Sequence, residues 1–251
     1  IGTVAVGFYS NYCMVINNIV MFINIVFSSV TASIGNMVVE KNKQKNYDVY
    51  SFMQLASFLL SSVAITVTYM VIDDLVYVWL GEKFVLEPIV IIAIVINMYF
   101  SVVLMPIWSY REATGMYLQT KYVMVATAIV NLVVSIILGK ILGLAGILFA
   151  TSIARIGTYF WYEPKLLFRQ FFGKEVWEYY KGIIKNIIVT LLVTTICWVI
   201  FRIFNVESWG MLFVKTVCVT LCSILLTVIC YYKDPCLKKI KNVVLGLLRR
   251  S

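Results

Sequence analysis

Seven long apolar runs constrain the fold of this chain more than any other feature. A helix needs about 20 mostly apolar residues to cross a bilayer core of roughly 30 Å, and runs of about that length occupy residues 12–37, 49–71, 88–109, 122–139, 141–162, 183–203 and 210–232. A membrane β-barrel would instead show segments of about ten residues with alternating polarity. The runs therefore predict an all-α, polytopic membrane helix bundle with seven transmembrane helices.

The composition excludes most other classes of protein. Of the 251 residues, 62% are hydrophobic and 13% are charged, and there is no histidine. Soluble domains carry about twice that share of charge, and without histidine no Ser-His or Cys-His pair and no His-ligated metal can form. We therefore expect a protein that is not an enzyme, with no catalytic residue, no bound metal and no cofactor.

Lysine and arginine positions predict the orientation of the spans, because cytoplasmic loops collect these residues. Sixteen of the 21 fall in connections on one side of the seven spans, including the C-terminal tail, four fall on the other side, and Arg155 lies within a span. This predicts a multi-pass membrane protein with its C-terminus in the cytoplasm. The net charge of +9 then reflects orientation and attraction to membrane lipids, and its dispersal over loops argues against nucleic-acid binding.

The first span, 12–37, carries many polar residues on defined sectors of the helix. Asn17, Asn24, Ser28 and Thr31 share one sector and Asn18 belongs to a second. The remaining sector, which includes Ile16 and Ile34, is apolar, and we expect it to face lipid. The polar sectors indicate either the lining of a cavity or hydrogen bonds to neighbouring helices.

Two arginines are candidate anion-binding residues. Arg155 lies inside the fifth span, where a charge is costly and usually marks a substrate path, although a long side chain can also reach back to the head groups. Arg111 follows Pro106, which is expected to bend the third span, and the alternative for Arg111 is a solvated ion pair with Glu112. No Asp or Glu is predicted deep in a span, so the sequence shows no ion-coupling carboxylate.

Three stretches carry a resemblance to a known family. They are VGFYSNYCMVINNIVMFINIVFSSVTASIGN, MYFSVVLMPIWSYREATGMY and GILFATSIARIGTYFWYEPKLLF. In order and spacing these resemble the Wzx-type oligosaccharide flippases of Gram-positive bacteria, which belong to the same superfamily as the multidrug and toxin extrusion (MATE) exporters. The last two spans add little to the resemblance.

The resemblance implies how the chain is organised. Such transporters have about fourteen helices in two lobes, so the seven spans are expected to form the second half, with the N-terminal lobe of the same protein as a partner missing upstream of Ile1. Residues 1–162 would be a MATE-like C-terminal lobe of five spans. Residues 163–182 would be a cytoplasmic interfacial amphipathic segment, and residues 183–251 would add two spans and a basic tail.

The resemblance also implies a function. These proteins carry undecaprenyl-pyrophosphate-linked oligosaccharide repeat units across the cytoplasmic membrane for capsule or cell-surface polysaccharide synthesis. Arg155 and Arg111 would hold the pyrophosphate of the substrate, and the polar residues of the first span (Asn17, Asn18, Asn24, Ser28 and Thr31) would meet its sugars. Two alternatives are a MATE-like exporter of drugs or small molecules and an inactive, truncated half-transporter. A membrane-embedded polymerase or glycosyltransferase is less favoured, since the sequence shows no charged catalytic loop.

Overall fold

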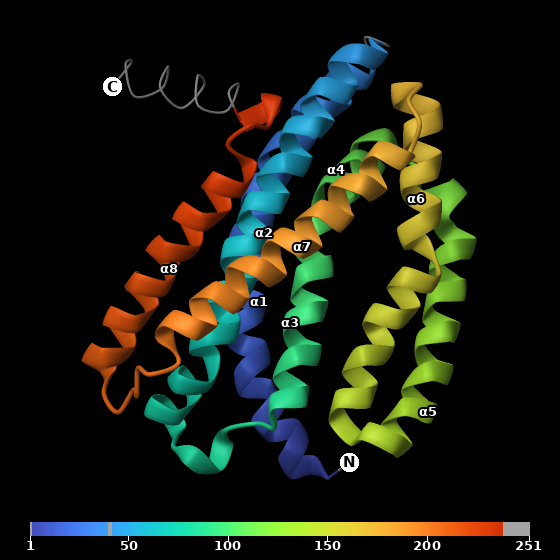
Figure 1. Ribbon diagram of the computed structural model, residues 1–251. Coiled ribbons are helices and arrows are strands. Elements are labelled where there is room, and N and C mark those ends of the chain that lie inside the picture. The colour runs from blue at the N-terminus through green and yellow to red at the C-terminus, as the bar shows by residue number, and fades with distance from the viewer. Residues whose placement is uncertain (1, 40–41, 238–251) are drawn as a thin grey trace.

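Helices account for all the regular structure of the computed structural model, which describes residues 2–39 and 42–237 (Figure 1). No strand occurs among these residues, so the predicted all-α fold is confirmed. The helices are α1 (Thr3–Val39), α2 (Lys43–Leu80), α3 (Pro88–Val103), α4 (Met105–Thr114), α5 (Tyr117–Gly157), α6 (Tyr159–Leu167), α7 (Trp177–Phe201) and α8 (Trp209–Tyr231), with a 3-10 turn η1 (Glu82–Phe84) and a π turn η2 (Phe168–Phe172).

Several of these helices are suited to a bilayer. Among the described residues, five helices are long and apolar enough to cross a membrane, and the bent pair of α3 and α4 would make a sixth. The chain is thus compatible with a membrane protein of several spans, as predicted. The predicted number of seven is not confirmed by length and composition, because α5 and the segments after it count as one continuous stretch, Tyr117–Phe172.

That stretch reverses direction at Gly143. Gly143 has φ 58° and ψ −131°, which interrupts the helix, and the two arms of α5 before and after it lie side by side (Figure 1). Asn131 Nδ2 donates to Thr151 Oγ1 at 3.2 Å across the arms, although an unbroken helix would separate these residues by about 30 Å. Close to the reversal, a Cβ on Gly146 would collide with the carbonyl oxygen of Leu138, so the arms approach here only because residue 146 is glycine.

The bend between α3 and α4 occurs where the sequence predicted it. The two helix axes differ by 43°, and Pro106 lies in the first turn of α4. Proline has no N–H to continue the helical hydrogen bonds of α3, so the expected bend at Pro106 is confirmed. The bend carries Arg111, on α4, toward α6.

Helix α2 lies at the centre of the bundle and contacts α1, α3, α7 and α8. Its face toward α7 presents small polar residues that are fully buried, among them Ser61, Ser62 and Thr66. Ser62 and Thr190 share a hydrogen bond of 2.9 Å. Small side chains allow membrane helices to approach closely and to bond across the interface, so the last two helices pack directly onto the helices before them.

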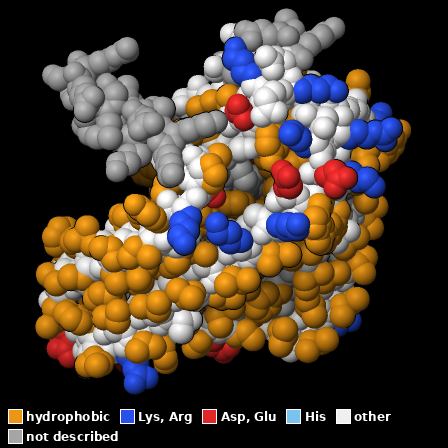
Figure 2. Space-filling model, turned by 45° about the horizontal axis from the view of Figure 1, so that its top comes forward, with side chains coloured by type: hydrophobic (Ala, Val, Ile, Leu, Met, Phe, Trp, Pro, Cys, Tyr) orange, Lys and Arg blue, Asp and Glu red, His pale blue; other side chains and the backbone are white. Residues whose placement is uncertain are grey.

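Most of the described bases gather at one end of the bundle, and a few, such as Lys83 in η1, lie at the other (Figure 2). This basic end comprises the start of α2, the connection from α4 to α5, the segment from α6 to α7 and the end of α8. The sides are covered by exposed apolar residues, chiefly from α5, α7 and α8. A continuous apolar exterior of this kind is unfavourable in water and is suited to hydrocarbon.

Candidate functional site

A polar groove lies between the two arms of α5. It has a volume of about 510 Å³ and is lined by Met124, Thr127, Ala128, Asn131, Leu132, Ser135, Thr151, Arg155 and Tyr159. The amide and the hydroxyls among these residues are hydrogen-bond donors and acceptors, and Arg155 adds the positive charge. The groove therefore combines a cation with several neutral polar groups on an otherwise apolar hairpin.

One edge of the Arg155 guanidinium is held by α3. Its Nη1 donates to the carbonyl oxygen of Asn97 at 3.2 Å and to Ser101 Oγ at 3.0 Å. Among the described residues, Nε and Nη2 have no protein partner. A guanidinium has five N–H donors in a planar fork, so the free edge of Arg155 can bind an additional acceptor on the groove.

Asn97 fixes the position of this arginine. Its Nδ2 donates to the carbonyl oxygen of Leu148 at 2.7 Å, and its Oδ1 accepts from Ser152 Oγ at 2.9 Å. Both partners lie on the second arm of α5, as Arg155 does. Asn97 thus joins α3 to the arm that carries Arg155, and the sequence hinted at this role only through a lone amide in an apolar span.

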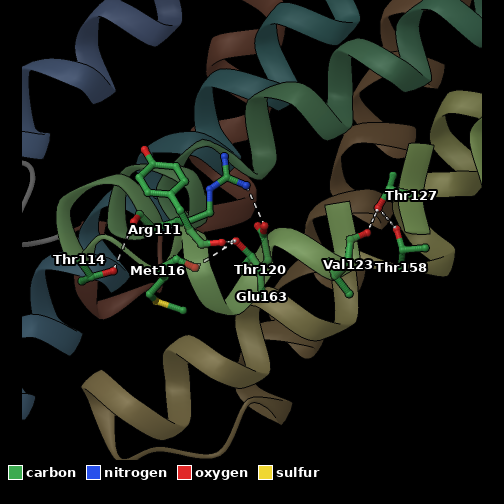
Figure 3. Close-up of polar contacts among 9 residues, drawn as sticks. Arg111, Thr114, Met116, Thr120, Val123, Thr127, Thr158 and Glu163 are labelled. Carbon is green, nitrogen blue, oxygen red and sulfur yellow. Dashed lines mark hydrogen bonds and ion pairs between the residues drawn. The ribbon is translucent and has the colours of Figure 1, made fainter. Parts of the chain in front are cut away.

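A second cation lies near the groove, and it is already paired. Arg111 Nη1 is 2.7 Å from Glu163 Oε1 (Figure 3). The side chains are 14% and 2% exposed, so the pair is shielded from solvent. The sequence alternative of a solvated pair with Glu112 is therefore wrong, because the bend before α4 brings Arg111 against α6. Glu163 follows directly after a predicted span, and nothing in the sequence indicated that it would be buried.

Tyr159 is influenced by the charges of both arginines. Its ring lines the groove beside Arg155, and the charges of Arg155, Arg111 and Glu163 all act on its hydroxyl group. Thr158, the residue before it, shares a hydrogen bond of 2.6 Å with Thr127 on the opposite arm (Figure 3). Helix α6 therefore carries both a residue that lines the groove, Tyr159, and a member of the ion pair, Glu163.

The predicted site residues of α1 lie apart from these arginines. Asn17, Asn18, Asn24 and Ser28 are exposed and Thr31 is partly buried. Three of them bond within their own helix, since Asn18 Nδ2, Ser28 Oγ and Thr31 Oγ1 donate to carbonyl oxygens three or four residues earlier. Across the described residues, no hydrogen bond joins this polar face of α1 to Arg155 or Arg111.

The apolar face of α1, which was expected to face lipid, is turned toward the bundle. Ile16 and Ile34, placed on the lipid-facing sector by the sequence analysis, are buried with Phe27, because α1 packs against α4, α2 and α3. The expectation that this sector faces lipid is wrong. Most of its apolar side chains contact the bundle, and the amides share the outer face with exposed apolar residues such as Phe22 and Ile25.

In comparisons with known proteins, no family model, no curated protein and no solved structure matches the chain.

Proposed function

We infer that the protein is a flippase that moves undecaprenyl-pyrophosphate-linked oligosaccharide across the cytoplasmic membrane. The observation that carries this proposal is the free edge of Arg155 in the polar groove of α5. A planar fork of N–H donors matches the oxygens of a phosphate, and binding an anion would offset the cost of keeping a guanidinium within a bilayer. An anionic substrate is therefore favoured over a cationic drug.

The neutral groups of the groove support a sugar-bearing substrate. Thr127, Asn131, Ser135 and Thr151 lie on the same groove as the arginine. Hydroxyl and amide groups both donate and accept hydrogen bonds, as sugar hydroxyls do. In this proposal the phosphate binds Arg155, the sugars contact the hydroxyls and amide along the hairpin, and the lipid chain stays in the surrounding hydrocarbon.

The exposed polar face of α1 supports a two-lobed arrangement. Asn17 and Asn24 make no hydrogen bond among the described residues, and polar side chains within a bilayer are normally covered by protein or face water. We propose that a second lobe faces this surface and that the amides of α1 contact sugars in the space between the lobes. Arg111 becomes a substrate ligand when it separates from Glu163.

The seven-span topology is part of the same proposal. If the reversal at Gly143 divides α5 into two crossings, and α3 with α4 makes one, the bundle crosses the membrane seven times. The basic end is then cytoplasmic by the distribution of bases.

Cysteine labelling tests this topology. In a background without native cysteines, Lys83→Cys is expected to react with a membrane-impermeant maleimide in intact cells, because η1 lies at the end opposite the basic end. Lys174→Cys, at the basic end, is expected to react only after the membrane is opened. Equal labelling of both positions in intact cells would contradict the topology.

Reconstitution tests the function. Vesicles containing the purified protein are expected to move a fluorescent, short-chain lipid diphosphate oligosaccharide to the outer leaflet, measured as quenching by an impermeant reagent. Vesicles with heat-inactivated protein serve as the control. Transport of a cationic dye without transport of the lipid-linked sugar would favour a drug exporter instead.

A further inference from the structure

Each member of the Arg111–Glu163 pair has a buried polar atom without a hydrogen-bond partner in the described part of the chain. Glu163 Oε1 accepts from Arg111, but its Oε2 is buried with no hydrogen-bond partner in the described part of the chain, and Arg111 Nε is in the same condition. Buried ion pairs are stable when their remaining donors and acceptors are satisfied. This pair therefore has unused hydrogen-bonding capacity at a position where burial makes it costly.

The pair and Arg155 share one neighbour, Tyr159, and the proposed diphosphate would bind both arginines beside it. Tyr159 lines the groove with Arg155, and its hydroxyl is acted on by the charge of Arg111 as well. A diphosphate has two adjacent phosphate groups, so it can offer one to each guanidinium. To accept the second phosphate fully, Arg111 has to give up its bond to Glu163.

We propose that Glu163 takes the place of the substrate's phosphate in the empty protein, and that it takes up a proton when a diphosphate displaces it from Arg111. This inference rests on the proposed function and adds a regulatory carboxylate to it. The reason is electrostatic. Once Arg111 binds the phosphate, an ionised Glu163 would be a buried, unpaired anion next to another anion, which is costly enough to favour the neutral acid.

The surroundings of Glu163 are compatible with that neutral form. Tyr179 is buried, its hydroxyl has no partner among the described residues, and the charge of Glu163 acts on it. A tyrosine hydroxyl can accept the hydrogen bond that a protonated carboxyl donates. Among the described groups, the charge of Arg111 on α4 acts on Glu163, and the charge of Glu163 acts on Tyr159 of α6 and Tyr179 of α7.

The proposal predicts proton uptake on binding. The bound state holds one more proton than the free state, so affinity for the anion should rise as pH falls, by up to about tenfold per pH unit while free Glu163 is ionised. The probe is a farnesyl diphosphate N-acetylglucosamine diester, whose phosphates stay ionised around neutral pH. Calorimetric titration of the full chain in nanodiscs, in two buffers of different ionisation enthalpy, gives the number of protons.

Glu163→Gln should bind the probe with no proton uptake and with an affinity that no longer varies with pH. Glu112→Gln is the matched control, because Glu112 is the exposed carboxylate next to Arg111 on α4, and this variant should behave like the wild type. If Glu163→Gln does not assemble, the double variant Arg111→Gln/Glu163→Gln removes both charges and should also show no uptake.

The outcomes separate the two proposals. Wild-type protein that binds the probe without taking up a proton, or a Glu163→Gln variant with unchanged uptake, would overturn the role of Glu163 and leave the flippase proposal standing. Failure of the wild type to bind the probe at all would overturn both.

Discussion

Replacing Arg155 with glutamine is expected to weaken binding of a lipid diphosphate sugar by about 10- to 100-fold and to slow its translocation in vesicles. A hydrogen bond to a charged group contributes about 1.5–3 kcal/mol, and each 1.4 kcal/mol changes affinity tenfold. Glutamine can still bond to the Asn97 carbonyl and Ser101 hydroxyl that now hold Arg155. The loss should therefore come from the missing charge and the missing fork of donors, with the helices still in place.

Two further variants identify why Arg155→Gln loses affinity. Arg155→Lys keeps the charge without the planar fork and should retain part of the affinity. Arg169→Gln removes an exposed charge at the basic end, so it controls for general attraction of anions and should bind almost as the wild type does. If Arg155→Gln transports normally, the side chain serves only to anchor the helix near the head groups, and the groove is not the substrate site.

Replacing Asn186 with leucine should lower the free energy of unfolding by about 2–4 kcal/mol, the largest loss expected for one substitution between these helices. Asn186 on α7 is fully buried. Its Oδ1 accepts from Tyr99 at 2.8 Å and from Ser61 at 3.2 Å, and its Nδ2 lies 3.1 Å from the Phe58 carbonyl oxygen, Ser62 Oγ and Tyr231 Oη. Leucine would leave the buried hydroxyls of Tyr99 on α3 and Tyr231 on α8 without this partner, and would remove the amide bonds to α2.

The measurement is reversible unfolding in mixed detergent micelles, followed by circular dichroism. Asn17→Leu is the matched control, because Asn17 is exposed on α1 and makes no hydrogen bond among the described residues, so its effect should stay within about 0.5 kcal/mol. Equal stability of the two variants would mean that the amide network does not hold α7 against α2 and α8.

Local patterns predicted the helices well. The apolar runs beginning at residues 88, 183 and 210 fall within α3, α7 and α8 or their immediate neighbours, since the length of an apolar run is a property of the chain itself. The bend between α3 and α4 was also predictable, because the N–H that Pro106 lacks removes a hydrogen bond from the helix in which the proline itself lies. The reversal at Gly143 falls close to the boundary expected between the fourth and fifth spans, at residue 140.

Pairings between distant residues were not predictable in this way. Arg111 and Glu163 are 52 positions apart, and Glu163 falls in the segment that the sequence predicts to be cytoplasmic and interfacial. The apolar side of α1 was also misjudged, since an apolar sector suits lipid and a protein interior equally well. Hydrocarbon and packed side chains are both apolar solvents, so periodicity alone cannot tell them apart.

The chain by itself determined that it forms apolar helices, where they break, and which of their ends collect positive charge, because each of these follows from neighbouring residues and from the thickness and charge of a bilayer. Only the tertiary structure decided which polar groups meet. The free edge of Arg155, the shielded Arg111–Glu163 pair and the bonds of Asn186 all depend on side chains from different helices arriving within about 3 Å of one another, and that distance is set by how the helices pack.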